Sequence, residues 1–349
     1  GYSKPVGEAT GEDFWGVDQD ITSVSEFISQ YVTKNNRWLS PKYLLGESYG
    51  GMRSGGVAYR LFTKHNLALA GVILVSPYLD FVAGNPGIGI DVAHVLFFTG
   101  FAATAWYHET VPDRPDDLHA FLDAAEHFAE TVYAPALFKG SRLSEAERRE
   151  VLAGMTRFTG ISEDYWDRAN LRIDESQFSK ELLRHAKETS GRADSRFTGE
   201  GLNHIAERFA YDPFDAAVSS AFTAAFHDYY RTDLGVRIDR DYVVGGELWK
   251  DWDESHKSPR TPQWYDTLPI ANTAVDLTYA MVQNPHMRVL VQQGYFDLAT
   301  PYGVTAYVLD HMELSPELRR NITVKHYEAG HMMYIHQPSL EAMARGRPA

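Results

Sequence analysis

Cysteine is absent from the 349 residues of this sequence. Its absence excludes disulfide bonds, thiolate metal ligands and a cysteine nucleophile. The sequence also lacks an H-E-x-x-H motif, and the glycine run Gly84-x-x-Gly87-x-Gly89 has the wrong spacing for a dinucleotide-binding fingerprint. We therefore expect no bound metal and no cofactor.

Basic residues and long apolar runs are also scarce. The chain has 33 basic and 47 acidic residues, for a net charge of −14, and it has no dense basic patch. This balance argues against nucleic acid or an anionic membrane as a partner. The longest apolar stretch, residues 91–106, is interrupted near its start by Asp91 and His94, so we expect it to be buried in the protein rather than to cross a bilayer.

The chain does contain an alternation of helical and strand patterns in its N-terminal part. Apolar residues at helical spacing span 21–32, and short apolar runs at 42–45 and 71–76 are typical of buried strands. A further helical pattern, weakened by two glycines, follows at 52–66. Helix, strand, helix and strand in this order predict an α/β fold.

The stretch YLLGESYGG, residues 43–51, joins the first strand pattern to the second helix pattern. It fits the motif G-x-S-x-G through Gly46, Ser48 and Gly50. In this motif a strand turns sharply into a helix and exposes the serine hydroxyl at the corner, and the glycines avoid collisions with neighbouring backbone. The motif makes Ser48 a candidate nucleophile, and an ordinary glycine-rich turn is the alternative.

A serine nucleophile needs a histidine base, which in turn is oriented by a carboxylate. Asp297 follows an apolar strand pattern, and His331 lies four residues beyond the next strand pattern, 321–327. The chain order of serine, acid and histidine is that of α/β-hydrolase triads. Among the 14 histidines, His326 and His336 are near competitors. A turn-forming aspartate and an ordinary hydrogen-bonded histidine are the alternatives.

Three separated motifs resemble those of the serine carboxypeptidases of the cathepsin A group. They are GESYGG at 46–51, GYFDLATP at 294–301 and AGHMMYIHQP at 329–338, and the opening GYS resembles a further segment of that family. The resemblance runs from residue 1 to about residue 345 and is weak in the middle. It implies an α/β-hydrolase fold with an inserted helical cap, in which Ser48 is the nucleophile, Asp297 the orienting acid and His331 the base.

The same resemblance implies three further roles around the triad. Tyr49 would supply one backbone N–H of the oxyanion hole, and Met332 would lie near the leaving-group pocket. Glu47, in its protonated form, would bind the free carboxylate of a peptide substrate, since a neutral acid can donate a hydrogen bond to an anion. The alternative for Glu47 is a buried structural acid bonded to the backbone.

Two departures from the family pattern matter. The lack of cysteine points to a bacterial branch without the disulfides of eukaryotic members, but it does not decide the compartment. We expect a periplasmic or secreted location. The family's N-G-G-P-G loop and the first strands of the sheet are absent, so we expect this chain to be the larger part of a split or trimmed protein. An N-terminal fragment or second chain would then complete the sheet and supply the second oxyanion donor.

The resemblance and the spacing together divide the chain into a first core part (1–86), a helical cap insertion (87–270) and a second core part (271–349). Helical patterns in the insertion cover 119–132, 144–155, 179–191 and 214–230. The second of them begins with a capping box, Ser144-x-x-Glu147. Aromatic residues of the insertion are expected in its core. These include Trp166, Phe222, Phe226, Tyr229 and Tyr230.

The function expected first is hydrolysis of the C-terminal peptide bond of a peptide with a free C-terminus, through an acyl-enzyme on Ser48. Because Glu47 must be protonated to bind the terminal carboxylate, we expect this activity to be favoured at acidic pH. The same triad would serve an esterase or an acyltransferase. A non-catalytic, carboxypeptidase-like binding protein is the remaining alternative.

Overall fold

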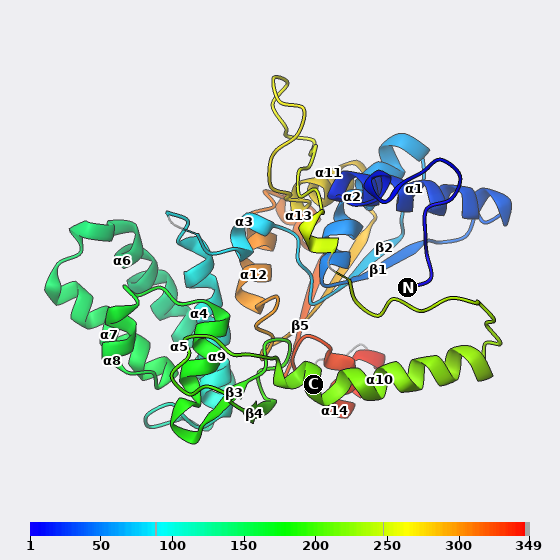
Figure 1. Ribbon diagram of the computed structural model, residues 1–349. Coiled ribbons are helices and arrows are strands. Elements are labelled where there is room, and N and C mark those ends of the chain that lie inside the picture. The colour runs from blue at the N-terminus through cyan, green and yellow to red at the C-terminus, as the bar shows by residue number, and fades with distance from the viewer. Residues whose placement is uncertain (88, 247, 346–349) are drawn as a thin grey trace.

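The computed structural model describes residues 1–87, 89–246 and 248–345, so the last residues of the second core part lie outside the described ranges. Four parallel strands form the central sheet, in the spatial order β1-β2-β5-β6 (Figure 1). The strands are β1 (Tyr43–Glu47), β2 (Gly71–Val75), β5 (Arg288–Gly294) and β6 (Ile322–Tyr327). Together with the helices between them, they give the α/β architecture that the sequence predicts.

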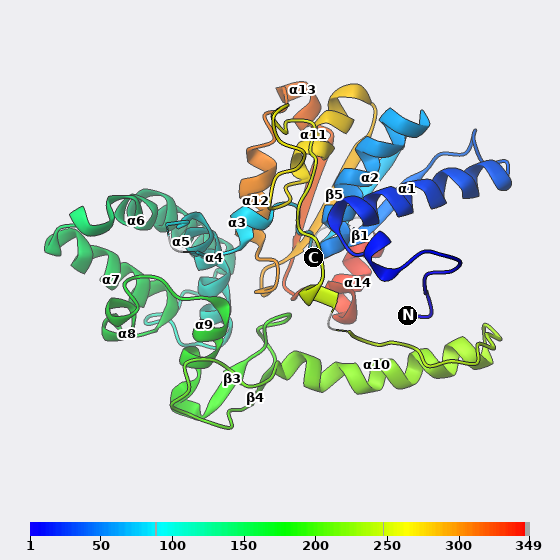
Figure 2. The same ribbon diagram turned by 45° about the horizontal axis from the view of Figure 1, so that its top comes forward.

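One face of the sheet is covered by helices (Figure 2). Side chains such as Val72, Leu74 and Val289, at alternate strand positions, are buried against this layer. Helix α2 starts directly after Ser48 and not at Met52, where the helical pattern begins. The helices of the layer are α1 (Val17–Lys34), α2 (Tyr49–His65), α11 (Ala274–Gln283) and α12 (Tyr302–Asp310).

The opposite face of the sheet is only partly covered. Near β6, Val75 and Tyr327 pack under helix α14 (Gln337–Ala344) in a small second core. Toward the edge strand β1, Tyr43 and Leu45 are 64% and 67% exposed. The described part of the chain therefore leaves apolar side chains uncovered at one edge of its parallel sheet.

Helix α4 (Val92–Tyr107) lies at the centre of the cap and carries the longest apolar stretch of the sequence. It is buried among other cap helices and also contacts α12, which belongs to the sheet layer. Over the described ranges, no helix combines the length and apolar character needed to cross a bilayer. Helix α3 (Phe81–Gly84) lies just before the cap. The other cap elements are α5 (Leu118–Phe128), α6 (Ala134–Lys139), α7 (Glu145–Thr159), α8 (Glu163–Arg168), α9 (Glu175–Leu182) and α10 (Pro213–Thr232), with the hairpin strands β3 (Glu188–Ser190) and β4 (Thr198–Glu200). Outside the cap, the short helix α13 (Pro316–Arg319) precedes β6.

The capping box at the start of α7 is formed: the Ser144 hydroxyl accepts from the Glu147 N–H, and the Glu147 carboxylate accepts from the Ser144 N–H. The helix expected over 179–191 is wrong, because α9 ends at Leu182. Beyond it the Leu183 carbonyl accepts from the Glu188 N–H, and the chain turns back through Lys187 at φ 62° into strand β3.

Four aromatic residues of α10 that are expected in the core, Phe222, Phe226, Tyr229 and Tyr230, are not buried. Figure 2 shows α10 as a long helix that stands away from the rest of the cap. Phe222 and Tyr229 are about half exposed, and Phe226 and Tyr230 pack against each other with ring centroids 4.6 Å apart. Trp166, by contrast, is fully buried as expected. Helical periodicity predicts the helix but not whether it lies against the body of the protein.

The last part of the insertion, residues 252–270, is not helical, and its first residues pack against the core. Asp253 accepts a backbone hydrogen bond from Val17 at the start of α1. Three residues on, the buried His256 lies between two carboxylates, with Nδ1 2.6 Å from Asp18 Oδ1 and Nε2 2.8 Å from Asp276 Oδ2. These contacts fix the segment between α1 and α11.

Candidate active site

Ser48 occupies the sharp turn between β1 and α2. Its backbone adopts φ 57° and ψ −123°, a left-handed conformation that favours glycine, and its N–H donates to the Val75 carbonyl at 3.0 Å. The turn brings the helix so close to the strand that a Cβ at Gly46 would lie 2.1 Å from the Gly50 carbonyl oxygen. This is the geometry that the G-x-S-x-G motif predicts.

Asp297 follows β5 and is completely buried. Its Oδ1 accepts the backbone N–H groups of Ala299 at 2.8 Å and Thr300 at 2.9 Å, and its Oδ2 lies 2.8 Å from the Thr300 hydroxyl. These donors hold the carboxylate in one orientation. Sequence reasoning missed Thr300, although a threonine three residues after an aspartate at a strand end is a pattern that favours such a turn.

His331 lies in the loop after β6, with its Nδ1 2.8 Å from Asp297 Oδ2. Since a carboxylate only accepts, Nδ1 carries the proton and Nε2 is left to accept one. The His331 carbonyl also accepts from the Ser76 hydroxyl at 2.8 Å. Burial lowers the pKa of His331, but Asp297 outweighs it, so the pKa lies above its ordinary value.

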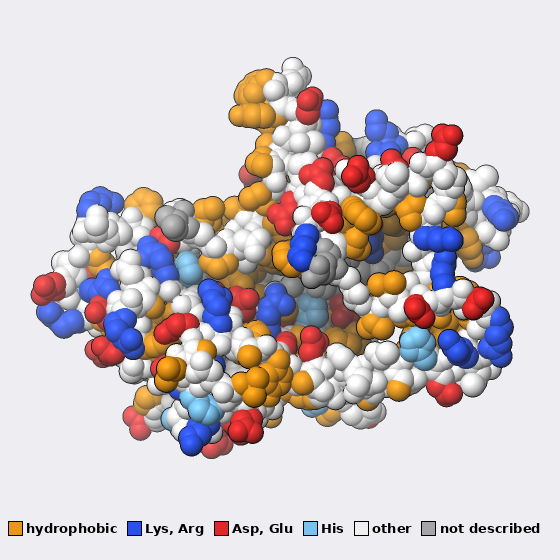
Figure 3. Space-filling view, in the orientation of Figure 1, with side chains coloured by type: hydrophobic (Ala, Val, Ile, Leu, Met, Phe, Trp, Pro, Cys, Tyr) orange, Lys and Arg blue, Asp and Glu red, His pale blue; other side chains and the backbone are white. Residues whose placement is uncertain are grey.

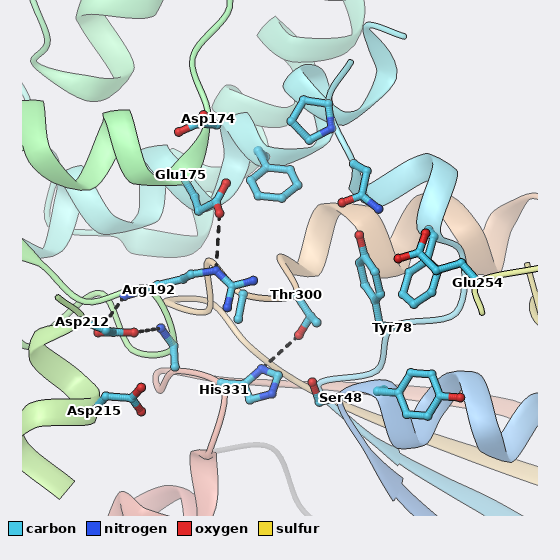
Figure 4. A pocket seen from close by; sticks show the side chains of 18 residues that line it. Ser48, Tyr78, Asp174, Glu175, Arg192, Asp212, Asp215, Glu254, Thr300 and His331 are labelled. Atoms are coloured by element: carbon cyan, nitrogen blue, oxygen red, sulfur yellow. Dashed lines mark hydrogen bonds and ion pairs between the residues drawn. The ribbon is translucent and has the colours of Figure 1, made fainter. Parts of the chain in front are cut away.

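Ser48 and His331 face each other across a cavity of about 600 Å³, as Figure 4 shows. The Asp297–His331 link is a hydrogen bond, whereas the Ser48 hydroxyl makes no hydrogen bond within the described ranges. The structure thus brings the three residues together at the ends of three strands. Catalytic hydrogen bonds of this kind often tighten only in the complex with substrate, so the missing Ser48–His331 bond does not argue against the pair.

The charged side chains on the walls of this cavity come from the cap (Figures 3 and 4). Arg192 reaches in from the β3–β4 turn, with Nε 3.4 Å from Glu175 Oε1. Asp212 accepts the backbone N–H of Arg192, and Glu254 lies on the opposite wall. Apolar parts of the wall are Tyr78, Phe81, Pro86 and Phe97.

Tyr49, the first residue of α2, has a backbone N–H without an acceptor among the described residues, as expected of an oxyanion donor. Its side chain turns away, and the hydroxyl donates to Asp20 Oδ2 at 3.1 Å, which also accepts from Arg53. Burial and the neighbouring Asp20 raise the pKa of the Tyr49 hydroxyl. The ring stands edge-on to Trp252, with centroids 5.4 Å apart.

Glu47 does not line the cavity that Ser48 shares with His331. It lies in a second cavity, of about 510 Å³, on the β1 side of Ser48, which we call the edge groove. Its two carboxylate oxygens accept from the Tyr334 hydroxyl at 3.0 and 3.1 Å. Burial and Glu47 raise the pKa of Tyr334, so this phenol stays a donor.

The remaining sequence candidates lie outside the cavity. Met332 follows His331 but is not among the lining residues, so the structure does not support a leaving-group pocket around it. His326 of β6 stacks on Tyr295, with ring centroids 5.1 Å apart, and His336 bonds to Ser339. Within the described ranges, no group of three or more acidic or histidine residues is placed to hold a metal ion.

No protein family and no curated protein matches the chain. Among solved structures, the crystal structure of VinJ is similar with a TM-score of 0.31 and 14% identity, over 96% of this chain and 73% of the VinJ chain. A TM-score this low shows neither a shared fold nor a shared function.

Proposed function

We propose that this chain is a serine hydrolase that acts by acyl transfer through Ser48. The observation that carries the proposal is the meeting of three residues from three separate strand ends. Ser48 sits on the strained turn after β1, Asp297 is held by its own loop, and His331 lies between them with its Nδ1 bonded to Asp297.

The proposed fold is an α/β hydrolase with an inserted cap. The strand–turn–helix at Ser48, the parallel sheet and the serine–acid–histidine order support it. Among hydrolases of this kind, the motifs around the three residues resemble the serine carboxypeptidases of the cathepsin A group. We therefore propose cleavage of the C-terminal peptide bond of a peptide, by a protein of the periplasm or of the secreted fraction.

In this reaction the Ser48 hydroxyl attacks the scissile carbonyl while its proton passes to His331 Nε2. Asp297 stabilises the imidazolium that forms, in line with the raised pKa of His331. The Tyr49 N–H donates to the tetrahedral oxyanion, which then collapses as His331 gives the proton to the leaving amine. Water hydrolyses the acyl group on Ser48 by the same steps in reverse.

Recognition of the substrate carboxylate is proposed for Glu47, with Tyr334 as its partner. Tyr334 bonds to both oxygens of Glu47, so it fixes the acid at the mouth of the edge groove next to Ser48. A peptide bound across Ser48 would then place its acyl part in the cap-side cavity and its terminal residue in the edge groove. This arrangement gives each cavity one part of the substrate.

A second candidate is an esterase or acyltransferase with the same triad. The position of Glu47 favours it, because Glu47 lines the edge groove and not the cavity that contains His331. A blocked peptide acid, its C-terminal amide and a simple ester of the same acyl group separate the two. A carboxypeptidase cleaves the acid fastest, whereas an esterase cleaves the ester and leaves the peptide acid intact.

Labelling with a fluorophosphonate tests the common premise. We expect one label per chain, on the tryptic peptide that contains Ser48, and no label in Ser48→Ala. The matched control is Ser23→Ala, because Ser23 lies on α1 and bonds only to the Asp20 carbonyl. An unlabelled chain would contradict the serine-hydrolase proposal and leave a non-catalytic binding protein.

We further propose that an extended N-terminal segment of the same protein, in this or a separate chain, adds a strand beside β1. The exposed Tyr43 and Leu45 and the edge groove support this, because an uncovered parallel edge strand offers unpaired backbone groups and apolar side chains. Mass spectrometry of the purified protein is expected to show a polypeptide that carries an N-G-G-P-G-type loop. Leu45→Lys is expected to reduce its retention. A labelled, monodisperse chain 1–349 without such a segment would contradict the proposal.

A further inference from the structure

The turn between β3 and β4, residues 191–197, belongs to the cap. It lies between the loop of Asp297, which follows β5, and the loop of His331, which follows β6; we call these the two catalytic loops. Its backbone bonds to both loops, so the loops are joined through it as well as through the sheet. The bonds run from Leu298 N–H to the Arg192 carbonyl at 3.0 Å, from Ser195 N–H to the Phe296 carbonyl at 2.9 Å and from His331 N–H to the Ala193 carbonyl at 2.6 Å.

The same turn is fixed on its other side to helix α4. His108 Nε2 donates to the Ser195 carbonyl at 2.6 Å, and the Thr104 hydroxyl lies 2.6 Å from the Ser195 hydroxyl. The turn therefore has a rigid backing within the cap. A rigid backing is what a structure needs if it is to hold a catalytic side chain within a fraction of an ångström.

Asp194 is the one carboxylate of this turn and is 1% exposed. Its Oδ2 accepts the backbone N–H of Gly330, the residue before His331, at 3.2 Å. The two residues approach so closely that a Cβ on Gly330 would lie 2.4 Å from Asp194 Cβ, so glycine is required there. Asp194 thus contacts the histidine loop at Gly330, directly before His331.

Arg196 completes the contact. Its Nε and Nη2 donate to the two oxygens of Asp194 at 2.9 and 2.7 Å, and its Nη1 donates to the Glu328 carbonyl at 2.7 Å. The Asp194–Arg196 pair therefore bonds to the histidine loop at two positions, Glu328 and Gly330. Removing one member of a buried ion pair leaves the other charge unpaired, so the loop would lose both contacts together.

We propose that Asp194 is a positioning residue that sets the place of His331 relative to Ser48; this rests on the proposed function of the triad. Asp297 holds the ring at Nδ1, but it does not fix the backbone that carries the ring. Asp194 and the Ala193 carbonyl fix that backbone through the N–H groups of Gly330 and His331. A loosened loop would keep the Asp297 bond in part and misplace Nε2.

The test compares Asp194→Ala and Asp194→Asn with wild type on an activated ester. Misplacement of a catalytic group by about 1 Å costs about 100-fold, so we expect Asp194→Ala to lower kcat by about 10- to 100-fold with KM changed less than about twofold. Asp194→Asn keeps an oxygen that can accept from Gly330 and is expected to recover part of the loss. Asp91→Asn is the matched control, because Asp91 pairs with Arg172 within the cap, away from both loops.

The low-field NMR resonance of the His331 Nδ1 proton gives a second readout, assigned by its absence in His331→Ala. We expect it to weaken or exchange faster in Asp194→Ala and to persist in Asp91→Asn. An Asp194→Ala protein with wild-type kcat and resonance overturns the inference, as does one that changes only KM. If Asp194→Ala does not fold, Asp194→Ser replaces it, since the shorter side chain loses Gly330 but leaves a polar group in the buried site.

The resonance needs no substrate, so it separates this inference from the proposed function. A wild-type protein that shows the resonance, is not labelled at Ser48 and loses the resonance in Asp194→Ala refutes the proposed function and supports the positioning role. A wild-type protein that is labelled, with an unchanged resonance and unchanged turnover in Asp194→Ala, does the reverse.

Discussion

The two cavities that meet at Ser48 differ in which parts of the chain line them. The cap-side cavity, which contains Ser48 and His331, is lined by residues of the cap, by the loops of Asp297 and His331 and by the segment around Glu254. The edge groove has β1 and α2 on one side, and on the other the surface is hollowed between α1 and α10, as the right side of Figure 3 shows. The groups that would activate Ser48 all lie on the side of Ser48 that faces the cap-side cavity.

This difference teaches which parts of the proposed reaction the chain supplies by itself. Base and acid are buried and bonded to each other, and the backbone N–H of Tyr49 is left available as one oxyanion donor. Recognition of a substrate terminus depends on Glu47, whose cavity is open along β1. Substitutions beside the cap-side cavity are therefore expected to have large effects on turnover, and those in the edge groove are expected to alter selectivity.

The largest expected effect concerns the orientation of His331 by Asp297, beside the cap-side cavity. Asp297→Asn keeps the shape of the side chain but favours the wrong tautomer of His331, and we expect kcat to fall about 10⁴-fold with little change in KM. Steady-state kinetics on an activated ester measures it. Asp80→Asn is the control, because Asp80 also accepts two backbone N–H groups, at the start of α3, without contact to the triad. A loss below tenfold would show that Asp297 does not orient the base.

A second titrating histidine, His256, lies four residues after Trp252 and holds that segment between α1 and α11. Burial lowers the pKa of His256, but Asp18 and Asp276 outweigh it and raise the pKa to about 9. His256 lines a surface cavity together with Tyr59, Arg60 and Lys64 of α2. A raised pKa stabilises the fold below the ordinary value of about 6.5, and that stability is lost as the pH rises through about 9.

We expect His256 to add on the order of 2 kcal/mol to the free energy of unfolding near neutral pH. Urea unfolding between pH 6 and 10 measures it: wild type should lose stability toward pH 9 to 10, and His256→Gln should be less stable at pH 6 and flatter across the range. The control His311→Gln removes an exposed histidine of the α12 end. Parallel curves for wild type and His256→Gln would contradict the assignment.

A smaller effect is expected at Thr300, the hydroxyl that orients Asp297. Thr300→Val removes one hydrogen bond to a charged group but keeps the shape of the side chain, so we expect kcat to fall about tenfold, equivalent to about 1.4 kcal/mol. Thr278→Val is the matched control, since its hydroxyl bonds only to the Ala274 carbonyl within α11. Equal kinetics for the two variants would show that the backbone donors alone hold Asp297.

The smallest effect is expected in the edge groove and concerns selectivity. If protonated Glu47 binds the terminal carboxylate, peptide acids are cleaved best in acid and peptide amides are not, while the raised pKa of His331 opposes very low pH because the base must be neutral. Glu47→Gln keeps a donor and is expected to flatten the alkaline fall for peptide acids. Identical pH profiles for acids and amides, unmoved by Glu47→Gln, would remove Glu47 from carboxylate recognition.

The sequence predicted the strands of the sheet and the loops of Ser48, Asp297 and His331, because apolar runs and glycine turns are local signals. It did not predict Tyr334 against Glu47, or Asp194 against Gly330, since these pairs are far apart in the chain and belong to no motif that links them. Local patterns specify elements, whereas such contacts arise only when the elements pack.

The same limit explains the errors in the cap. The pattern over 179–191 continues a helix, yet the turn at Lys187 serves the hairpin that reaches the catalytic loops. The apolar and aromatic spacing of α10 is that of a packed helix, yet Figure 2 shows it standing free along most of its length. Periodicity records that a face is apolar and not what covers it.

Holding Ser48 at φ 57° and ψ −123° has a cost for the folded state. A non-glycine residue in such a region costs on the order of 1–3 kcal/mol, so the neighbouring strand and helix must hold the turn against its own preference. A glycine at this corner would remove the strain together with the hydroxyl, and under the proposed function it would give a chain that is inert but at least as hard to unfold. The protein is thus less stable at Ser48 than its fold allows, which is the trade between stability and activity expected where a residue is retained for chemistry.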